Sequence, residues 1–218
     1  MENLLTVKSE NLNLGLMKKM TAERMAELFH TGEDEKQEGH LLVCVGSWAA
    51  YNAGGRHSLG TCYKGDFFID FMALNGSEEL DGVLDYLGWS EQEKEELFIQ
   101  DYESDFYETE NADYTNPRSL ADFINDNRKV FSDSEAMEKI AAYVDYYGGE
   151  SSFKWAVENV EKFEFFPGIT AADYAEELTE STVNIPEFLK CYIDYQKMGK
   201  DCELDGKITE TKKGVFVW

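Results

Sequence analysis

The chain has 218 residues, of which 44 are Asp or Glu and 20 are Lys or Arg, so its formal net charge is −24. Hydrophobic residues make up 43% and aromatic residues 14%, which is enough for a buried core and excludes generic acidic disorder. The charge excludes duplex DNA and anionic membranes as direct ligands, because both need clustered basic side chains. We therefore expect a positively charged partner.

The first 40 residues are interpreted as an N-terminal extension. Thr21 is placed to cap a short helix that ends near Phe29, and the polar run 31–39 has the composition of a linker. No basic segment followed by an apolar one opens the chain, and no uncharged stretch is long and apolar enough to span a bilayer. The four cysteines form no CxxC pair. We therefore expect a cytoplasmic protein with reduced thiols.

Three strands are expected next, over residues 41–48, 58–63 and 67–72, with a turn at 51–55. From Ser77 the apolar spacing becomes helical, and one side of this helix carries Leu80, Val83, Leu84 and Leu87.

Helix starts can be predicted further along the chain from capping signals. Capping-box pairs begin at Ser90, Ser132 and Thr170, and Pro186 is suited to the first turn of another helix. The closing segments 207–211 and 213–218 are expected to pair as strands. Strands, then short helices, then strands predict an α+β fold in two or three small modules.

The acidic excess is concentrated in residues 66–113, which hold 16 Asp or Glu and one basic residue, Lys94. The other 170 residues carry 28 acids against 19 bases, whereas a halophilic adaptation would spread acids over the whole chain. A solvated face that aids solubility is one interpretation. Aromatic residues among the acids instead indicate a folded segment that holds its carboxylates in fixed positions, like a line of phosphates. We predict that the partner-binding carboxylates are Glu78, Glu79, Asp81, Asp85, Glu91, Glu93, Glu95, Glu96, Asp101, Glu103, Asp105, Glu108, Glu110 and Asp113.

Signatures of catalysis or metal binding are not found in the sequence. The segment 55–61 has the outer spacing of a phosphate loop but lacks its lysine, and residues 201–212 resemble a calcium loop with Lys212 where a bidentate Glu should stand. His30, His40 and His57 show no zinc-ligand spacing, and no GxSxG elbow is present. We therefore predict no enzyme, no cofactor and no metal site.

Three segments in order carry a resemblance to a known family. Residues 45–54 (VGSWAAYNAG) resemble the opening strand and turn of the ArdA antirestriction proteins, and residues 98–103 (FIQDYE) resemble their F-x-Q-D-Y-E segment. A late helix and closing strand follow, in which the matching residues are Pro186-Glu187-Phe188, Tyr192-Ile193-Asp194-Tyr195, Asp201 and Gly214-Val215-Phe216. The resemblance covers roughly residues 41–218, with Cys62-Tyr63 and Gly199-Lys200 as departures from the usual pattern.

This resemblance implies an elongated, acidic homodimer that is carried on mobile elements such as conjugative transposons. It would mimic bent B-form DNA and occupy the DNA-binding groove of type I restriction–modification enzymes, on their methyltransferase core. We expect an extension of unknown role over 1–40, an α+β module over 41–105, a central helical module over 106–165, and a C-terminal α+β module over 166–218 that forms the dimer.

Two other readings of the acidic block remain. A cation-dependent hydrolase or calcium-binding protein could use the clustered acids, and an acidic adaptor for some other basic protein would differ from an inhibitor only in its partner.

Overall fold

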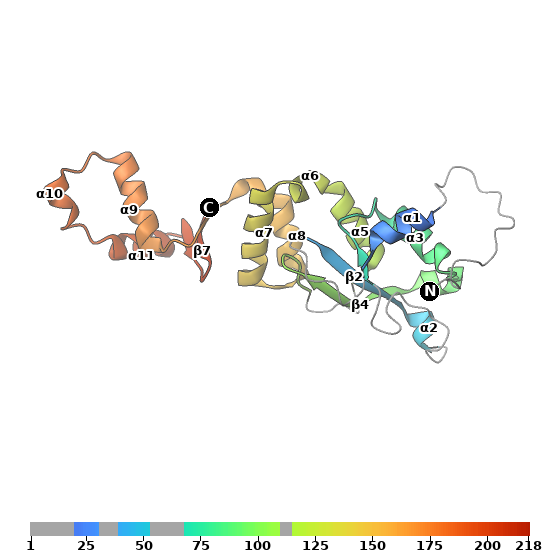
Figure 1. Ribbon diagram of the computed structural model, residues 1–218. Coiled ribbons are helices and arrows are strands. Elements are labelled where there is room, and N and C mark those ends of the chain that lie inside the picture. The colour runs from blue at the N-terminus through green and yellow to red at the C-terminus, as the bar shows by residue number, and fades with distance from the viewer. Residues whose placement is uncertain (1–19, 31–38, 53–67, 110–114) are drawn as a thin grey trace.

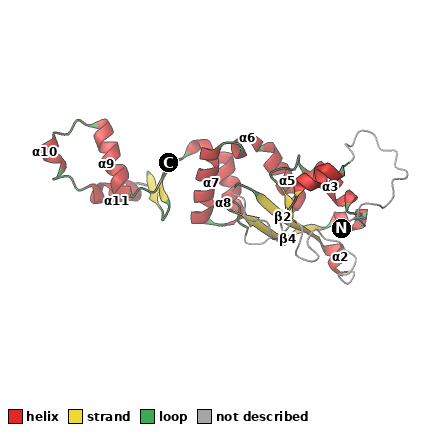
Figure 2. Ribbon diagram, viewed as in Figure 1, coloured by secondary structure: helices red, strands yellow, loops and turns green. Residues whose placement is uncertain are grey.

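The structure is a computed structural model that describes residues 20–30, 39–52, 68–109 and 115–218. It is an elongated α+β protein with two small antiparallel sheets and eleven α-helices among the described residues, as expected from the sequence (Figures 1 and 2). The helices α9, α10 and α11 lie at one end, α7 and α8 lie in the middle, and the larger sheet lies beyond them (Figure 1).

The larger sheet has the strand order β1-β3-β2-β4, and all of its neighbouring strands are antiparallel. Its strands are β1 (Phe29–His30), β2 (Leu41–Ser47), β3 (Phe68–Asp70) and β4 (Leu97–Ser104). Every residue of β2 is buried, because β2 lies between two other strands and contributes to apolar clusters on both of its faces. The register with β4 shifts between Cys44 and Val45, so that Gln100 is the extra residue of a β-bulge.

Short helices connect these strands. The first part of the chain contains α1 (Ala22–Leu28), α2 (Trp48–Asn52), α3 (Ser77–Tyr86) and α4 (Glu91–Glu95). The predicted caps at Thr21 and Ser90 are confirmed, and Ser90 with Glu93 forms a capping box. The expected apolar side of α3 is also confirmed, since Leu80, Val83 and Leu84 are buried.

The central helices pack around one core of apolar side chains. They are α5 (Pro117–Asp126), α6 (Arg128–Phe131), α7 (Ser134–Tyr147), α8 (Gly149–Asn159) and the 3-10 turn η2 (Val160–Lys162). Their buried residues join those of α1, α3 and the larger sheet in one continuous cluster, with Phe153 fully buried inside it.

The second sheet, β5-β7-β6, connects this core to the C-terminal segment. It contains β5 (Glu164–Pro167), β6 (Ile208–Glu210) and β7 (Gly214–Val217). Three helices lie between β5 and β6 in the sequence: α9 (Ala171–Thr182), α10 (Glu187–Lys190) and α11 (Tyr195–Leu204). Successive residues of β7 face opposite sides of the sheet. Phe216 therefore joins the main core, whereas Val215 packs with Ala171 and Ile208 in a separate small cluster.

Several local predictions need correction. The cap of α7 is Asp133, whose carboxylate accepts hydrogen bonds from the Glu135 and Ala136 amides; Ser132 instead donates its hydroxyl to the Arg128 carbonyl. Pro186 is the residue before α10 rather than its first helical residue. The residues after Ser47 form α2 where a turn was expected, whereas the predicted strand 58–63 lies outside the described residues.

The prediction of four reduced thiols is wrong. Cys44, which is fully buried in β2, is disulfide-bonded, whereas Cys191 and Cys202 are free. Spacing in the sequence could not reveal this bond, because a disulfide needs spatial proximity rather than a CxxC pattern. None of the described helices is long and apolar enough to cross a membrane.

Candidate partner-binding surface

Among the described residues, Asp70 of the acidic block lies on β3, and the other acids of the block lie on α3, α4 and β4 or directly after these elements. Three of the aromatic residues between these acids are buried: Phe98, Phe106 and Tyr107 are all less than a tenth exposed. Phe106 and Tyr107 both pack against the ring of Phe153 from α8. The backbone of β4 and of the residues directly after it is therefore fixed by buried rings.

On α3, two of the predicted carboxylates are bound by arginines from distant parts of the chain. The Glu79 carboxylate accepts hydrogen bonds from Nε and Nη2 of Arg24 at 2.8 and 2.9 Å. It also accepts a hydrogen bond from the backbone amide of Asn75 at 2.8 Å. The Arg24 hydrogen bond holds the pKa of Glu79 below its usual range. The Asp81 carboxylate accepts hydrogen bonds from Nε and Nη2 of Arg118 at 2.9 and 2.7 Å. Both acids are only partly exposed.

On α4, the side chain of Lys94, the only basic residue of the acidic block 66–113, is buried. Its ammonium contacts the carboxylates of Asp85 and Glu91, the latter at 2.7 Å. Burial lowers the pKa of Lys94, but the hydrogen bonds that its ammonium donates to both carboxylates outweigh this effect and raise the pKa overall. The carbonyl oxygen of Lys94 also accepts Nη1 of Arg118 at 2.7 Å, which ties α4 to α5.

Along β4 the acids alternate with other residues. Asp101 and Glu103 are two positions apart in the strand, so they share a face at a spacing of about 7 Å, roughly twice the axial rise per phosphate of one DNA strand. Asp105, just after the strand, accepts the Gly39 amide with both carboxylate oxygens at 3.3 and 3.4 Å. The Asp101 carboxylate accepts the amide of Tyr102 at 2.8 Å.

The structure thus divides the predicted acids into two groups. One group is used within the fold by arginines, by Lys94, by backbone amides or by the Ser90 capping box; it comprises Glu79, Asp81, Asp85, Glu91, Glu93, Asp101 and Asp105. The other group makes no ion pair or side-chain hydrogen bond within the described part of the chain, and we call it the open carboxylates: Glu78, Glu95, Glu96, Glu103 and Glu108. Glu110 and Asp113 lie outside the described residues.

Arg24 and Arg118 are the residues of this surface that the sequence did not indicate. They come from α1 and α5, 55 and 37 residues away from the acids that they bind. No local pattern identifies such partners, since the contact arises only when α1 and α5 pack beside α3.

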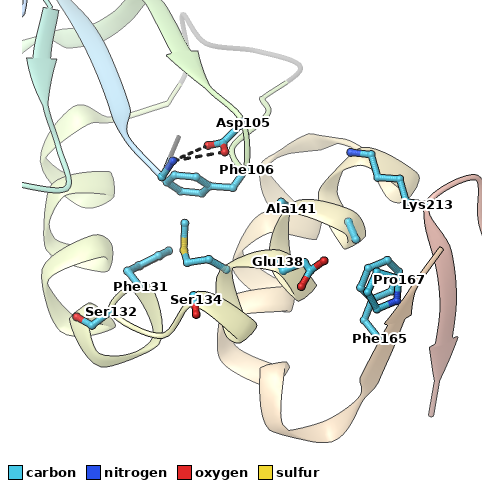
Figure 3. A pocket seen from close by; sticks show the side chains of 13 residues that line it. Asp105, Phe106, Phe131, Ser132, Ser134, Glu138, Ala141, Phe165, Pro167 and Lys213 are labelled. Carbon is cyan, nitrogen blue, oxygen red and sulfur yellow. Dashed lines mark hydrogen bonds between the residues drawn. The ribbon is translucent and has the colours of Figure 1, made fainter. Parts of the chain in front are cut away.

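A cleft separates the larger sheet from the second sheet, with a volume of about 760 Å³ (Figure 3). Its walls are mostly apolar and include Phe106, Phe131 and Phe165. The charged side chains among the described residues that line it are Asp105, Glu138 and Lys213, and Asp105 already binds the Gly39 amide (Figure 3).

A second exposed surface lies at the C-terminal end of the molecule and is apolar. Phe188 is 71% and Tyr192 is 81% exposed, although aromatic side chains of this size are normally buried. They belong to a set on α9, α10, α11 and their connections, which we call the C-terminal apolar surface: Leu178, Val183, Phe188, Leu189, Tyr192, Met198 and Leu204. Exposed apolar side chains concentrated at one end of a molecule are typical of an interaction site.

The first two segments that carried the family resemblance pack directly on each other. Gly46 of β2 pairs with Phe98 of β4, and a Cβ atom at Gly46 would lie 2.4 Å from the Phe98 ring. The Trp48 ring stacks on the same ring, with the two centroids 4.4 Å apart. The glycine, the tryptophan and the phenylalanine of the two motifs therefore form one structural unit.

Together, the fold and this surface define an acidic α+β protein that presents carboxylates on a helix–strand frame. The family model of the antirestriction protein ArdA matches residues 43–217, so the chain belongs to that family. A search of curated proteins finds no match to the chain.

Proposed function

We propose that the protein protects DNA from restriction by mimicking it: the acidic surface of α3, α4 and β4 occupies the DNA-binding groove of a type I restriction–modification enzyme. The family match over residues 43–217 carries this proposal. The partner would be the methyltransferase core of that enzyme, and no chemical step would be catalysed.

Charge and rigidity support this mode of action. A groove that binds duplex DNA is lined with Lys and Arg. The open carboxylates can meet these cations without breaking any ion pair within the described residues, and the buried rings of Phe98, Phe106 and Tyr107 keep the strand and its flanks in place. Acids arranged in this way give fast, electrostatically steered association that weakens with salt.

We further propose that the chain acts as a homodimer formed by residues 166–218. The C-terminal apolar surface supports this assignment, because a second copy would cover Phe188 and Tyr192. The small separate cluster around Ala171, Ile208 and Val215 supports a module boundary near residue 166. In this division, residues 1–40 form an extension, and residues 41–105 and 106–165 form the two modules between it and the dimerisation module.

A competition assay tests the function. A type I enzyme bound to a fluorescent duplex that contains its recognition site is titrated with the purified chain at 50 mM and 200 mM NaCl. We expect the chain to displace the duplex at the lower salt concentration and to do so much less well at the higher one. Failure to displace the duplex at low salt would contradict the proposal.

The reading as a cation-dependent hydrolase gains no support from the geometry of the acids. Within the described residues, no three acids of the 66–113 block converge on one point closely enough to hold a metal ion. Residues Asp201–Leu204 of the calcium-loop-like segment lie in α11, not in a loop.

A further inference from the structure

Two of the three histidines meet a buried aspartate on the larger sheet. The Nδ1 atom of His40 lies 2.7 Å from Oδ2 of Asp70, and the Nε2 atom of His30 lies 4.0 Å from the same oxygen. All three ligand atoms lie within 4.8 Å of one another. Among the described residues, this is the one group of three or more His, Cys, Asp or Glu side chains arranged in this way.

The fold fixes the carboxylate of this cluster. Asp70 is the last residue of β3 and is 3% exposed. Its Oδ1 atom accepts the Met72 amide at 2.9 Å, which leaves Oδ2 directed at the two imidazoles. A second hydrogen bond that orients a ligating carboxylate is a recurrent feature of metal sites in proteins.

We propose that His30, His40 and Asp70 form a site for a divalent transition metal of the zinc class. Zinc binds nitrogen and carboxylate oxygen at about 2.0–2.2 Å, which in tetrahedral geometry separates the ligand atoms by roughly 3.3–3.5 Å. The two distances to Oδ2, 2.7 and 4.0 Å, lie on either side of this value, so small side-chain rotations bring all three ligands into place. Two imidazoles favour zinc and its neighbours over magnesium or calcium.

Solvent can complete the coordination. The side chain of His40 is 32% exposed and that of His30 is 19% exposed, so a water molecule can reach the fourth position. The aspartate, in contrast, is shielded, and a buried carboxylate gains most from a bound cation because water does not screen it.

The location of the ligands gives the site its role. His30 and His40 both precede the family match, which begins at residue 43, whereas Asp70 lies within it. The described part of the extension is also attached by the two-residue strand β1, by Met25 and Leu28 in the core, by Arg24, and by the Gly39 amide, which donates to Asp105. The metal would clip the N-terminal extension to the edge of the sheet. This proposal does not depend on DNA mimicry.

Calorimetric titration of the full chain tests the site. The chain is first stripped with a chelator and then titrated with ZnCl2, and we expect one equivalent to bind. The variant with both His30→Gln and His40→Gln should bind at least about tenfold more weakly. The control variant Cys191→Ser with Cys202→Ser removes the two cysteines that are free among the described residues, and it should bind zinc like the wild type. No saturable binding, or binding lost only in the cysteine variant, would overturn the proposal.

A measurement on the unaltered chain covers the case in which the histidine variant folds poorly. Nitrogen-15 NMR of the imidazole side chains follows all three histidines during the zinc titration. We expect the resonances of His30 and His40 to shift until one equivalent has been added and then to stop. If neither of them responds, the cluster is a hydrogen-bonded group only and the metal site is refuted.

Discussion

The open carboxylates should carry most of the interaction with a restriction enzyme, and replacing all five by glutamine tests this directly. The substitutions are Glu78→Gln, Glu95→Gln, Glu96→Gln, Glu103→Gln and Glu108→Gln. Four of these side chains are exposed and Glu103 is half-buried, and none has an ion-pair partner within the described residues. Glutamine keeps the size of each side chain, so the fold should be retained.

The size of the effect follows from the number of charges removed. An exposed ion pair contributes about 0.2–1 kcal/mol, so five pairs with groove cations amount to about 1–5 kcal/mol. This corresponds to an inhibition constant that rises by between about fivefold and a few thousandfold. The apparent affinity should also depend less steeply on salt, because fewer charges are neutralised on binding. Any single substitution should change inhibition by no more than about sixfold.

The assay is displacement of a fluorescent duplex from a type I enzyme, measured at several salt concentrations. A matched control removes five acids outside the block that have no partner within the described residues: Asp126→Asn, Glu138→Gln, Glu158→Gln, Glu161→Gln and Glu176→Gln. Both variants have the same net charge. Equal weakening in both would show that total charge matters rather than the surface of α3, α4 and β4. Complete loss of activity from one substitution would point to a catalytic carboxylate instead.

Three further predictions concern stability and assembly. Gly46→Ala should lower the free energy of unfolding, measured in urea, by about 1–3 kcal/mol, because the added Cβ would lie 2.4 Å from the Phe98 ring. The control is Gly82→Ala in helix α3, where the added Cβ would lie 3.7 Å from the nearest atom, Cε of Met20. This control should raise the free energy of unfolding by about 0.5–1 kcal/mol, because alanine favours the helix over glycine. Arg24 depresses the pKa of Glu79, so this pair stabilises the fold above the unfolded pKa of about 4.3 and loses its effect as pH falls through the folded value. Urea unfolding at a series of pH values should therefore show that Glu79→Gln loses less stability than the wild type on going from about pH 5 to pH 3, and equal losses would refute this linkage. Tyr192→Ser should shift the chain toward monomer in analytical ultracentrifugation with little change in stability, and a wild-type chain that is already monomeric would contradict the dimer.

The parts of the fold that could be predicted are those set by local chemistry. A threonine or serine cap with an acid three residues later gave the starts of α4 and α9 correctly. At Ser132 the same pattern was misleading, because the adjacent Asp133 is the stronger hydrogen-bond acceptor and takes the cap. Strand β4 was missed, because its Gln100 bulge and its acids interrupt the apolar alternation that identifies a strand.

The candidate surface was predictable as a region but not as a set of residues. Counting charges located it, since 16 acids against one base is a local anomaly in the sequence. Which acids are open depends on Arg24 and Arg118, which reach the surface only through packing between distant helices. The grouping of His30 and His40 with Asp70 is equally non-local, because it depends on the pairing of β1 with β3.

The arginines also explain how the fold can carry so concentrated a charge. Like charges about 6 Å apart repel by roughly 0.7 kcal/mol even in bulk water, so an unrelieved block of acids would cost several kcal/mol. Arg24 donates two hydrogen bonds to Glu79, and Arg118 donates two to Asp81. Nη2 of Arg24 also donates to the Ala73 carbonyl at 2.6 Å, and Nη1 of Arg118 donates to the Lys94 carbonyl at 2.7 Å. Each cation therefore relieves repulsion and anchors a neighbouring segment at the same time. Because these cations are already engaged within the fold, they shield the acids that they bind, and the attraction for a basic groove rests on the open carboxylates.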